Sequence, residues 1–156
     1  MRVRPYEARD AASVSLVYRR SVESLGPNDY TAEQVAAWAS LTPSSEQLHA
    51  RLTDGRAAFV AVDDADSVLG FIDLESDGHI DLLYCAPEAA GSGVAGALFA
   101  VVEALARERG VTRLYSEASE AALRFFTKRG FVTLHRRNLN IHGVAIHNYA
   151  VEKLLT

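Results

Sequence analysis

The chain has 156 residues, of which 49% are hydrophobic and 23% charged, and its formal net charge at pH 7 is -4. These values are typical of one globular domain, and the negative charge argues against a general attraction to nucleic acid or anionic membranes. No apolar run approaches the roughly 20 residues of a membrane span, and the first ten residues lack the apolar segment of a secretory signal. Cys85 is the single cysteine, which excludes an internal disulfide and a cysteine-rich metal site, so a cytoplasmic location is expected.

The first third of the chain is predicted to be mainly helical. A short strand at 3–5 precedes Asp10, a plausible N-cap for a helix whose apolar residues recur every three or four positions up to Leu25. Two further short helices are predicted by capping-box pairs at Thr31–Gln34 and Ser44–Gln47.

The middle of the chain changes to strands separated by short polar turns. Three strands are predicted, at Ala57–Val62, Val68–Glu75 and His79–Cys85. Because the turns between them are short, these strands should pair as an antiparallel meander.

The last third alternates helices and strands. The pattern predicts a helix at Gly93–Arg109, a strand at Thr112–Glu117, a helix at Ser119–Lys128, and strands at Phe131–Asn140 and Val144–Glu152. No repeat or linker is visible, so a single domain over 1–156 is expected. The element order predicts an α/β fold with a mixed central sheet of about seven strands flanked by helices.

A glycine-rich turn joins a predicted strand to a predicted helix in the run LYCAPEAAGSGVAGAL, from Leu83 to Leu98. Gly91, Gly93 and Gly96 would let backbone N–H groups approach an anionic ligand, and the following helix adds its positive N-terminal end. Such turns are also ordinary packing devices. A nucleotide-binding protein is a weak alternative, because no Lys follows the glycines.

The chain resembles the GNAT superfamily of N-acetyltransferases in element order and in two motifs. The superfamily's acetyl-CoA signature reads Gln/Arg-x-x-Gly-x-Gly/Ala after a strand and a Pro-containing loop. Here Pro87 lies in the loop, Gly93 and Ala95 take the small positions, and Ala90 replaces the Gln or Arg. The second motif, Asn-x-x-Ala-x-x-Phe-Tyr with a Gly-Phe ending, resembles SEAALRFFTKRGF. Its positions in register are Ser119, Ala122, Phe125, Phe126, Gly130 and Phe131.

A narrower resemblance connects two other stretches with a bacterial subgroup akin to the YafP-like acetyltransferases. These stretches are YTAEQVAAWAS (Tyr30–Ser40) and GHIDLLYCAP (Gly78–Pro87). The resemblance implies an acetyl-CoA-dependent enzyme that transfers acetyl directly to an amine of a small molecule or peptide. The implied cofactor-binding residues are Leu83, Tyr84, Cys85, Ala90, Gly91, Ser92, Gly93, Val94, Ala95, Gly96, Ser119, Phe125 and Phe126.

Phe126 is the most consequential departure from the family pattern. It occupies the position of the tyrosine that often protonates the leaving thiolate, and a phenyl ring has no proton to give. With Ala90, it supports an alternative in which the domain is a non-catalytic acyl-CoA-binding or sensor module. The backbone amides near Tyr84 and Cys85 are the expected donors to the thioester carbonyl.

Candidate catalytic bases follow from strand alternation. His79, Asp81, Leu83 and Cys85 share one face of their predicted strand, and Glu117 ends the strand after the long helix. Asp81 and Glu117 are favoured as bases, with His79 third, although each is also compatible with a solvated or salt-bridged surface group. His79 with Asp81 lacks a nearby third ligand for a metal, and Cys85 is expected to be a buried structural thiol.

Substrate contacts are expected from Tyr30 and Trp38, which by resemblance overhang the acceptor pocket, and from Asp73. An aromatic residue at helical spacing is, however, more often part of the core. His147 and Asn148 on the last predicted strand could also border the site. No metal is expected, the acceptor amine is left open, and the final strand pair could extend a sheet between two subunits of a homodimer.

Overall fold

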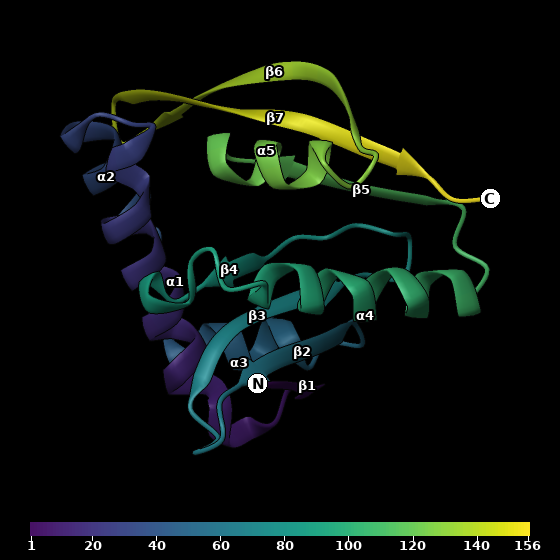
Figure 1. The fold of residues 1–156 in the computed structure, drawn as a ribbon. Helices are drawn as coiled ribbons and strands as arrows, with labels where there is room; N and C mark the ends of the chain where they lie inside the picture. The colour runs from purple at the N-terminus through teal and green to yellow at the C-terminus, as the bar shows by residue number, and fades with distance from the viewer.

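Two antiparallel sheets meet at a seam in the middle of the molecule, with helices packed around them (Figure 1). The computed structural model describes residues 1–156. The strands are β1 (Arg2–Pro5), β2 (Ala57–Val62), β3 (Val68–Leu74), β4 (Leu83–Cys85), β5 (Arg113–Ala118), β6 (Val132–Ile141) and β7 (Val144–Leu154). The α-helices are α1 (Ala11–Leu25), α2 (Ala32–Ala39), α3 (Ser45–Leu52), α4 (Val94–Glu108) and α5 (Glu120–Thr127). None of these helices is both long and apolar enough to cross a bilayer.

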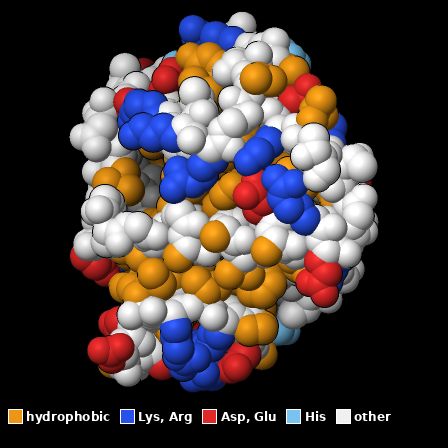
Figure 2. All heavy atoms as spheres, turned by 45° about the vertical axis from the view of Figure 1, so that its right-hand side comes forward, with side chains coloured by type: hydrophobic (Ala, Val, Ile, Leu, Met, Phe, Trp, Pro, Cys, Tyr) orange, Lys and Arg blue, Asp and Glu red, His pale blue; other side chains and the backbone are white.

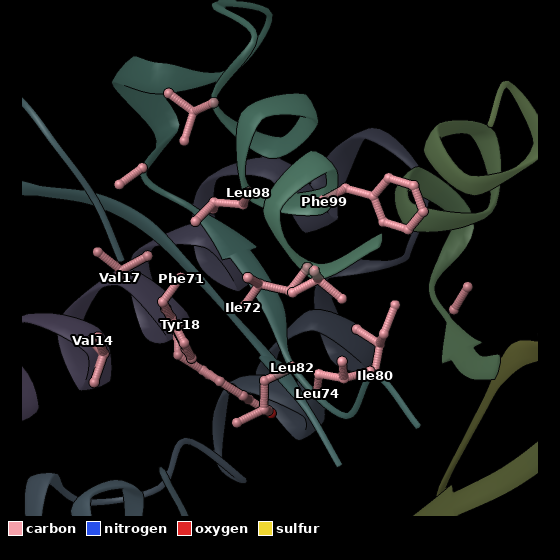
Figure 3. Close-up of a cluster of buried hydrophobic side chains, with 14 of the residues drawn as sticks. Val14, Val17, Tyr18, Phe71, Ile72, Leu74, Ile80, Leu82, Leu98 and Phe99 are labelled. Atoms are coloured by element: carbon pink, nitrogen blue, oxygen red, sulfur yellow. The ribbon is translucent and has the colours of Figure 1, made fainter. Parts of the chain in front are cut away.

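The first sheet has the order β1-β2-β3-β4 and lies between α1 and α4. A Cβ added to Gly70 of β3 would lie 2.9 Å from Tyr84 O and 3.1 Å from Val94, so a larger residue there would force β4 or the start of α4 to shift. The next residue of β3, Phe71, stacks on Tyr84, and Tyr84 packs against Tyr18 of α1. Figure 3 shows side chains of α1 and α4 converging on β3 to form the core.

The second sheet has the order β5-β7-β6 and carries α5 on one face (Figure 1). Its long β6–β7 hairpin turns at His142 and Gly143, both of which have positive φ. A cluster of phenylalanines joins α4 to α5: the rings of Phe126 and Phe131 lie 4.6 Å apart, and Phe99 lies 5.7 Å from Phe131. This cluster packs α5 and the start of the β6 segment against α4, which itself packs on the first sheet.

The two sheets are connected at the seam by one parallel bridge, between His79 and Tyr115. Ile80 N donates to Tyr115 O at 2.9 Å and Tyr115 N donates to Gly78 O at 3.1 Å, after which the pairing stops. Beyond this bridge, Asp81 and Leu82 direct their amides to the buried Asp73 carboxylate at 2.9 and 2.8 Å. The strand predicted at His79–Cys85 therefore forms only at Leu83–Cys85.

The predicted α/β architecture with about seven strands is confirmed, but the single mixed sheet occurs as sheets of four and three strands. Both predicted capping boxes are present, at Thr31 and at Ser44. Asp10 lies at the N-cap position of α1 without capping it through its side chain. That carboxylate instead forms a buried bidentate pair with Arg4, whose two terminal nitrogens each lie 2.8 Å from an Asp10 oxygen.

The Arg4–Asp10 pair links β1 to the start of α1, and both side chains are buried. We expect Asp10→Asn to destabilise the fold by about 2 kcal/mol, because the buried Arg4 guanidinium loses its bidentate partner and keeps only the partly exposed Asp66 carboxylate, 3.1 Å from its Nε. Burial raises the pKa of Asp10, but hydrogen bonds from Arg4 and the Glu7 amide more than offset it, so the net pKa is lowered. The pair's stabilisation is thus present above the usual aspartate pKa and is lost as the pH falls through the lowered value.

Urea unfolding of the wild type and Asp10→Asn at neutral pH measures this difference. Glu7→Gln is the matched control, because it removes a neighbouring exposed carboxylate that pairs with Arg9. Equal stability of Asp10→Asn and wild type would contradict the prediction.

Candidate active site

Two cavities open on the seam and share a wall. The first, of about 190 Å³, lies between the parted strands β4 and β5 and is closed by α1, α2, α5 and the β6–β7 hairpin. The second, of about 150 Å³, runs from the seam to α4. The residues that line both cavities are Tyr30, Trp38, Leu83, Tyr84, Ser119 and Ala122. A group bound at Leu83 and Tyr84 would therefore be reachable from both sides.

The second cavity leads to the glycine-rich turn. Gly91 and Gly93 have φ values of +74° and +88°, and a Cβ on either would meet no atom within 4 Å. Gly93 is the left-handed N-cap of α4, and the first hydrogen bond of that helix is from Ala97 N to Gly93 O at 3.0 Å. The amides of 94–96 thus precede the helical ladder, beside open space, as a phosphate-binding helix terminus requires.

Most of the predicted cofactor-binding residues lie along this path. Those that line the second cavity are Leu83, Tyr84, Cys85, Ala95, Ser119 and Phe125. Those of the turn and first helical turn are Ala90, Gly91, Ser92, Gly93, Val94 and Gly96. Phe126 lines the first cavity instead and is only 1% exposed, within the phenylalanine cluster.

Arg129 is a residue at this site that the sequence analysis missed. Its Nη2 lies 2.8 Å from where a Cβ on Gly96 would be, and its guanidinium lies 3.7 Å above the Phe125 ring. The group donates to Phe125 O at 3.2 Å and has no carboxylate partner. It therefore places a positive charge beside the first turn of α4, where Ala90 supplies none. The only sequence signal was a basic residue directly before Gly130.

The pairing of β4 with β3 determines which amides face the seam. Asp73 N donates to Leu82 O at 3.2 Å and Ala86 N donates to Leu69 O at 2.8 Å. Bonded pairs alternate along an antiparallel ladder, so the N–H groups of Leu83 and Cys85 point away from β3. They face the side where β5 has parted. These are the donors available to a carbonyl oxygen at the junction of the two cavities.

Glu117 lies in the first cavity and belongs to a carboxylate–imidazole–carboxylate array. Its Oε1 lies 2.8 Å from Nε2 of His79, and Nδ1 of His79 lies 2.7 Å from Oε1 of Glu75. The hydrogen bond to Glu117, opposed by burial and supported by Glu75, raises the pKa of His79 to about 9. The same bond lowers the pKa of Glu117. His79 is thus an imidazolium that orients Glu117, and it lines neither cavity.

Asp81 also lies in the first cavity, but its carboxylate is already paired. Its Oδ2 lies 3.1 Å from Nη1 of Arg56 and 3.6 Å from Nη1 of Arg51. Asp73, expected as a substrate contact, is completely buried, lines neither cavity, and bonds Arg56 at 2.7 Å. Burial raises the pKa of Asp73 to about 6. Asp73 therefore has a structural role, because its carboxylate accepts from the amides of Asp81 and Leu82 and so holds the segment that precedes β4.

Tyr30 and Trp38 both line the two cavities, with their rings 5.6 Å apart. The Tyr30 hydroxyl donates to His147 O and accepts from Glu120 N, each at 3.1 Å, so it joins α5 to β7. His147 and Asn148 line the first cavity, as the sequence suggested.

Cys85 lines the second cavity, and burial raises the pKa of its thiol to about 11. At neutral pH the sulfur is therefore a thiol rather than the thiolate that nucleophilic attack requires.

The His79 array predicts a titration that can be measured directly. In Glu117→Gln, we expect the pKa of His79 to fall from about 9 towards the usual value of 6.5, because the main hydrogen bond to the charged imidazolium is weakened. The measurement is an NMR pH titration of the His79 ring protons. Glu120→Gln is the control, since Glu120 contacts His147 instead. Because the folded pKa is raised, the array's stabilisation is complete below the unfolded pKa and is lost as the pH rises through about 9. An unchanged His79 pKa in Glu117→Gln would contradict the array.

Comparison with known proteins agrees with this geometry. The family model described as "Acetyltransferase (GNAT) domain" matches residues 27–153. The uncharacterized N-acetyltransferase YafP of Escherichia coli K12 is 28% identical over 149 residues, covering 96% of this chain and 93% of that protein. An uncharacterized N-acetyltransferase of Mycobacterium tuberculosis H37Rv is 28% identical over 129 residues, covering 78% and 83%.

Solved structures show the same similarity. A GCN5-related N-acetyltransferase from Rhodopseudomonas palustris has a TM-score of 0.90 and 36% identity, covering 99% of this chain and 95% of that one. The PaiA N-acetyltransferase of Thermoplasma acidophilum, solved in complex with coenzyme A, shares the fold with a TM-score of 0.77 and 19% identity, covering 99% and 98%. The non-catalytic binding module is thus not favoured. With the family model spanning most of its length, the chain belongs to the GNAT family and is an acyl-CoA-dependent N-acetyltransferase.

Proposed function

We propose that the protein transfers an acetyl group directly from acetyl-CoA to an amine of a small molecule or peptide, within a ternary complex. The observation that carries this proposal is the pair of cavities that meet at Leu83 and Tyr84. One cavity reaches the N-terminus of α4, and the other contains the oriented carboxylate of Glu117. The single cysteine is compatible with a cytoplasmic enzyme.

The second cavity fits the coenzyme. Bound acetyl-CoA would supply the thioester from which the acetyl group is transferred. The amides of the first turn of α4 would bind its pyrophosphate, and Arg129 would add the charge that Ala90 does not. The Leu83 and Cys85 amides would polarise the thioester carbonyl, because they are fixed before the oxyanion develops.

Glu117 is the better of the two candidate bases. The amine must lose a proton to attack, and a carboxylate within reach, directly or through one water, can accept it. Asp81 is held through its Oδ2 by two guanidinium groups, those of Arg56 and Arg51, which stay charged and so oppose its protonation. Glu117 is ionised and faces the first cavity, while His79 binds it from behind. We therefore assign Glu117 as the base and His79 as its positioning residue.

The departing thiolate requires a proton that Phe126 cannot give. Three hydroxyls line both cavities, and that of Tyr30 already donates its proton to His147 O. The Ser119 hydroxyl accepts from Ala122 N, so its own proton remains available. Burial raises the pKa of Tyr84 well above its usual value, so Tyr84 also stays protonated. We propose Tyr84 as the donor to the leaving sulfur, with Ser119 as the alternative.

The pyrophosphate site predicts a charge-specific effect at Gly93. Gly93→Asp should raise the Kd for acetyl-CoA by about tenfold relative to Gly93→Asn, because it places a carboxylate against the pyrophosphate, and tenfold corresponds to about 1.4 kcal/mol. Gly93→Asn is the matched control, because Asn has nearly the same shape as Asp and would have to adopt the same left-handed φ, but carries no charge. Isothermal titration with acetyl-CoA measures both variants. Equal Kd values for Asp and Asn would place the pyrophosphate elsewhere.

The base assignment predicts a loss of turnover without a loss of coenzyme binding. Glu117→Gln should lower kcat by about 10²-fold or more, the range of general-base catalysis, while the Kd for acetyl-CoA stays unchanged. Thiol release from acetyl-CoA in the presence of an amine panel measures the rate. Asp81→Asn, the matched carboxylate-to-amide change, should reduce kcat less. Wild-type rates in Glu117→Gln across the pH range would overturn the assignment, and coenzyme binding without thiol release from any amine would overturn the proposed function.

A further inference from the structure

We propose that the acceptor is a primary monoamine on a short apolar or aromatic body that carries no anionic group. This inference rests on the proposed function, and it names the substrate class of the same site. It is drawn from the lining of the first cavity: its ring surfaces, its charges and the state of each of its polar groups.

The first cavity is mainly apolar. Eleven of its seventeen lining residues are hydrophobic. Aromatic rings line it from five elements or loops, and these are Tyr18, Tyr30, Trp38, Tyr84 and Phe126. The wall formed by the β6–β7 hairpin adds Leu139, Ile141 and Ile146. An acceptor that fills this cavity gains most from an apolar or aromatic body, whose surface leaves water on binding.

The charges in the lining are acidic. Asp81 and Glu117 are its charged side chains, and no Lys or Arg is among the seventeen residues. On the face drawn in Figure 2, Lys and Arg side chains lie beside Asp and Glu side chains, in contrast to the lining, whose charged groups are these two carboxylates. A protonated amine entering the site meets Glu117, whereas a carboxylate or phosphate would meet two like charges.

The nearby cations lie outside the lining. Arg56, whose side chain is 10% exposed, is bound by Asp54, Asp73 and Asp81. Arg137 of β6 lies near enough to Glu117 to help lower the pKa of that carboxyl, but it donates to Asn148 Oδ1 at 3.2 Å and does not line the cavity. An anionic group on the acceptor would therefore meet no cation among the lining residues, which is costly.

Several polar groups of the lining are engaged, which disfavours sugars and polyamines. Ser116 donates to Ile80 O at 2.6 Å, and Tyr30 donates to His147 O at 3.1 Å. A sugar's hydroxyls would meet a mainly apolar wall in which these two donors are already used. A second ammonium would find Asp81 already paired with Arg56 through Oδ2. One cation on an apolar body satisfies the site best.

The test compares amines that differ in one feature each. With saturating acetyl-CoA, thiol release is measured for 2-phenylethylamine, phenylalanine, spermidine, glucosamine and a short peptide with a free N-terminus. We expect kcat/KM for 2-phenylethylamine to exceed that for every other amine by at least about tenfold, the discrimination that unpaired buried polar groups impose. Preference for any other member would overturn the substrate class while leaving the proposed function intact. Acetyl-CoA binding with no thiol release from any amine would overturn both.

A charge placed in the lining gives a second test. Leu139→Arg should lower kcat/KM for 2-phenylethylamine by at least about tenfold and raise the phenylalanine to 2-phenylethylamine ratio, because it puts a cation beside the amine and supplies a partner for the carboxylate. Leu134→Arg is the matched control on the same strand, since Leu134 is 47% exposed and lines neither cavity. An unchanged ratio in Leu139→Arg, with the folded state verified by circular dichroism, would contradict the proposal.

Discussion

The parting of β4 from β5 is the constraint on which the rest of the structure depends. Two backbone hydrogen bonds around Tyr115 hold the sheets together, and then the strands separate. An uninterrupted parallel pair would use the amides of Leu83 and Cys85 and would fill the space in which both cavities meet. Separation leaves those amides without a strand partner, which is costly in a buried seam unless a ligand or water accepts from them. The site is therefore a consequence of incomplete pairing, and the Phe99, Phe126 and Phe131 cluster stabilises the sheets on either side of it.

The charges around the seam divide into two groups with different roles. One group stabilises the fold: Arg56 binds Asp73 and Asp81, and Asp73 accepts from the Asp81 amide, which holds the chain before β4. Glu75, His79 and Glu117 form a second array that ends in the first cavity. The His79 imidazolium lies between the carboxylates of Glu75 and Glu117 and keeps Glu117 ionised and oriented. Glu117 therefore needs no buried arginine as a partner. This separation explains why two carboxylates in the same cavity, Asp81 and Glu117, are not equivalent as bases.

The sequence predicted local features well and long-range pairing poorly. Capping boxes at Thr31 and Ser44, and the glycine turn before α4, depend on residues a few positions apart, and the structure has all of them. The strand at His79–Cys85 was predicted too long, because its alternating pattern contains no sign that the Asp73 carboxylate takes two of its amides. Asp73 itself was expected to contact substrate, because the sequence does not distinguish a buried strand carboxylate from an exposed one. Arg129 was missed because its role depends on the contact between α5 and the first turn of α4.

By itself, the sequence determined the element order, the family resemblance and the position of the glycine turn, because these follow from local propensity and from motifs within short windows. It also determined that Phe126 has no proton to donate. Tertiary structure alone decided that His79 binds Glu117, that Arg56 binds Asp81, and that Arg129 lies over Gly96. Each of these contacts joins residues at least 25 positions apart, and which charge meets which depends on how the two sheets part and pack. Side-chain identity offers the chemistry, but only the fold decides which groups remain free to perform it.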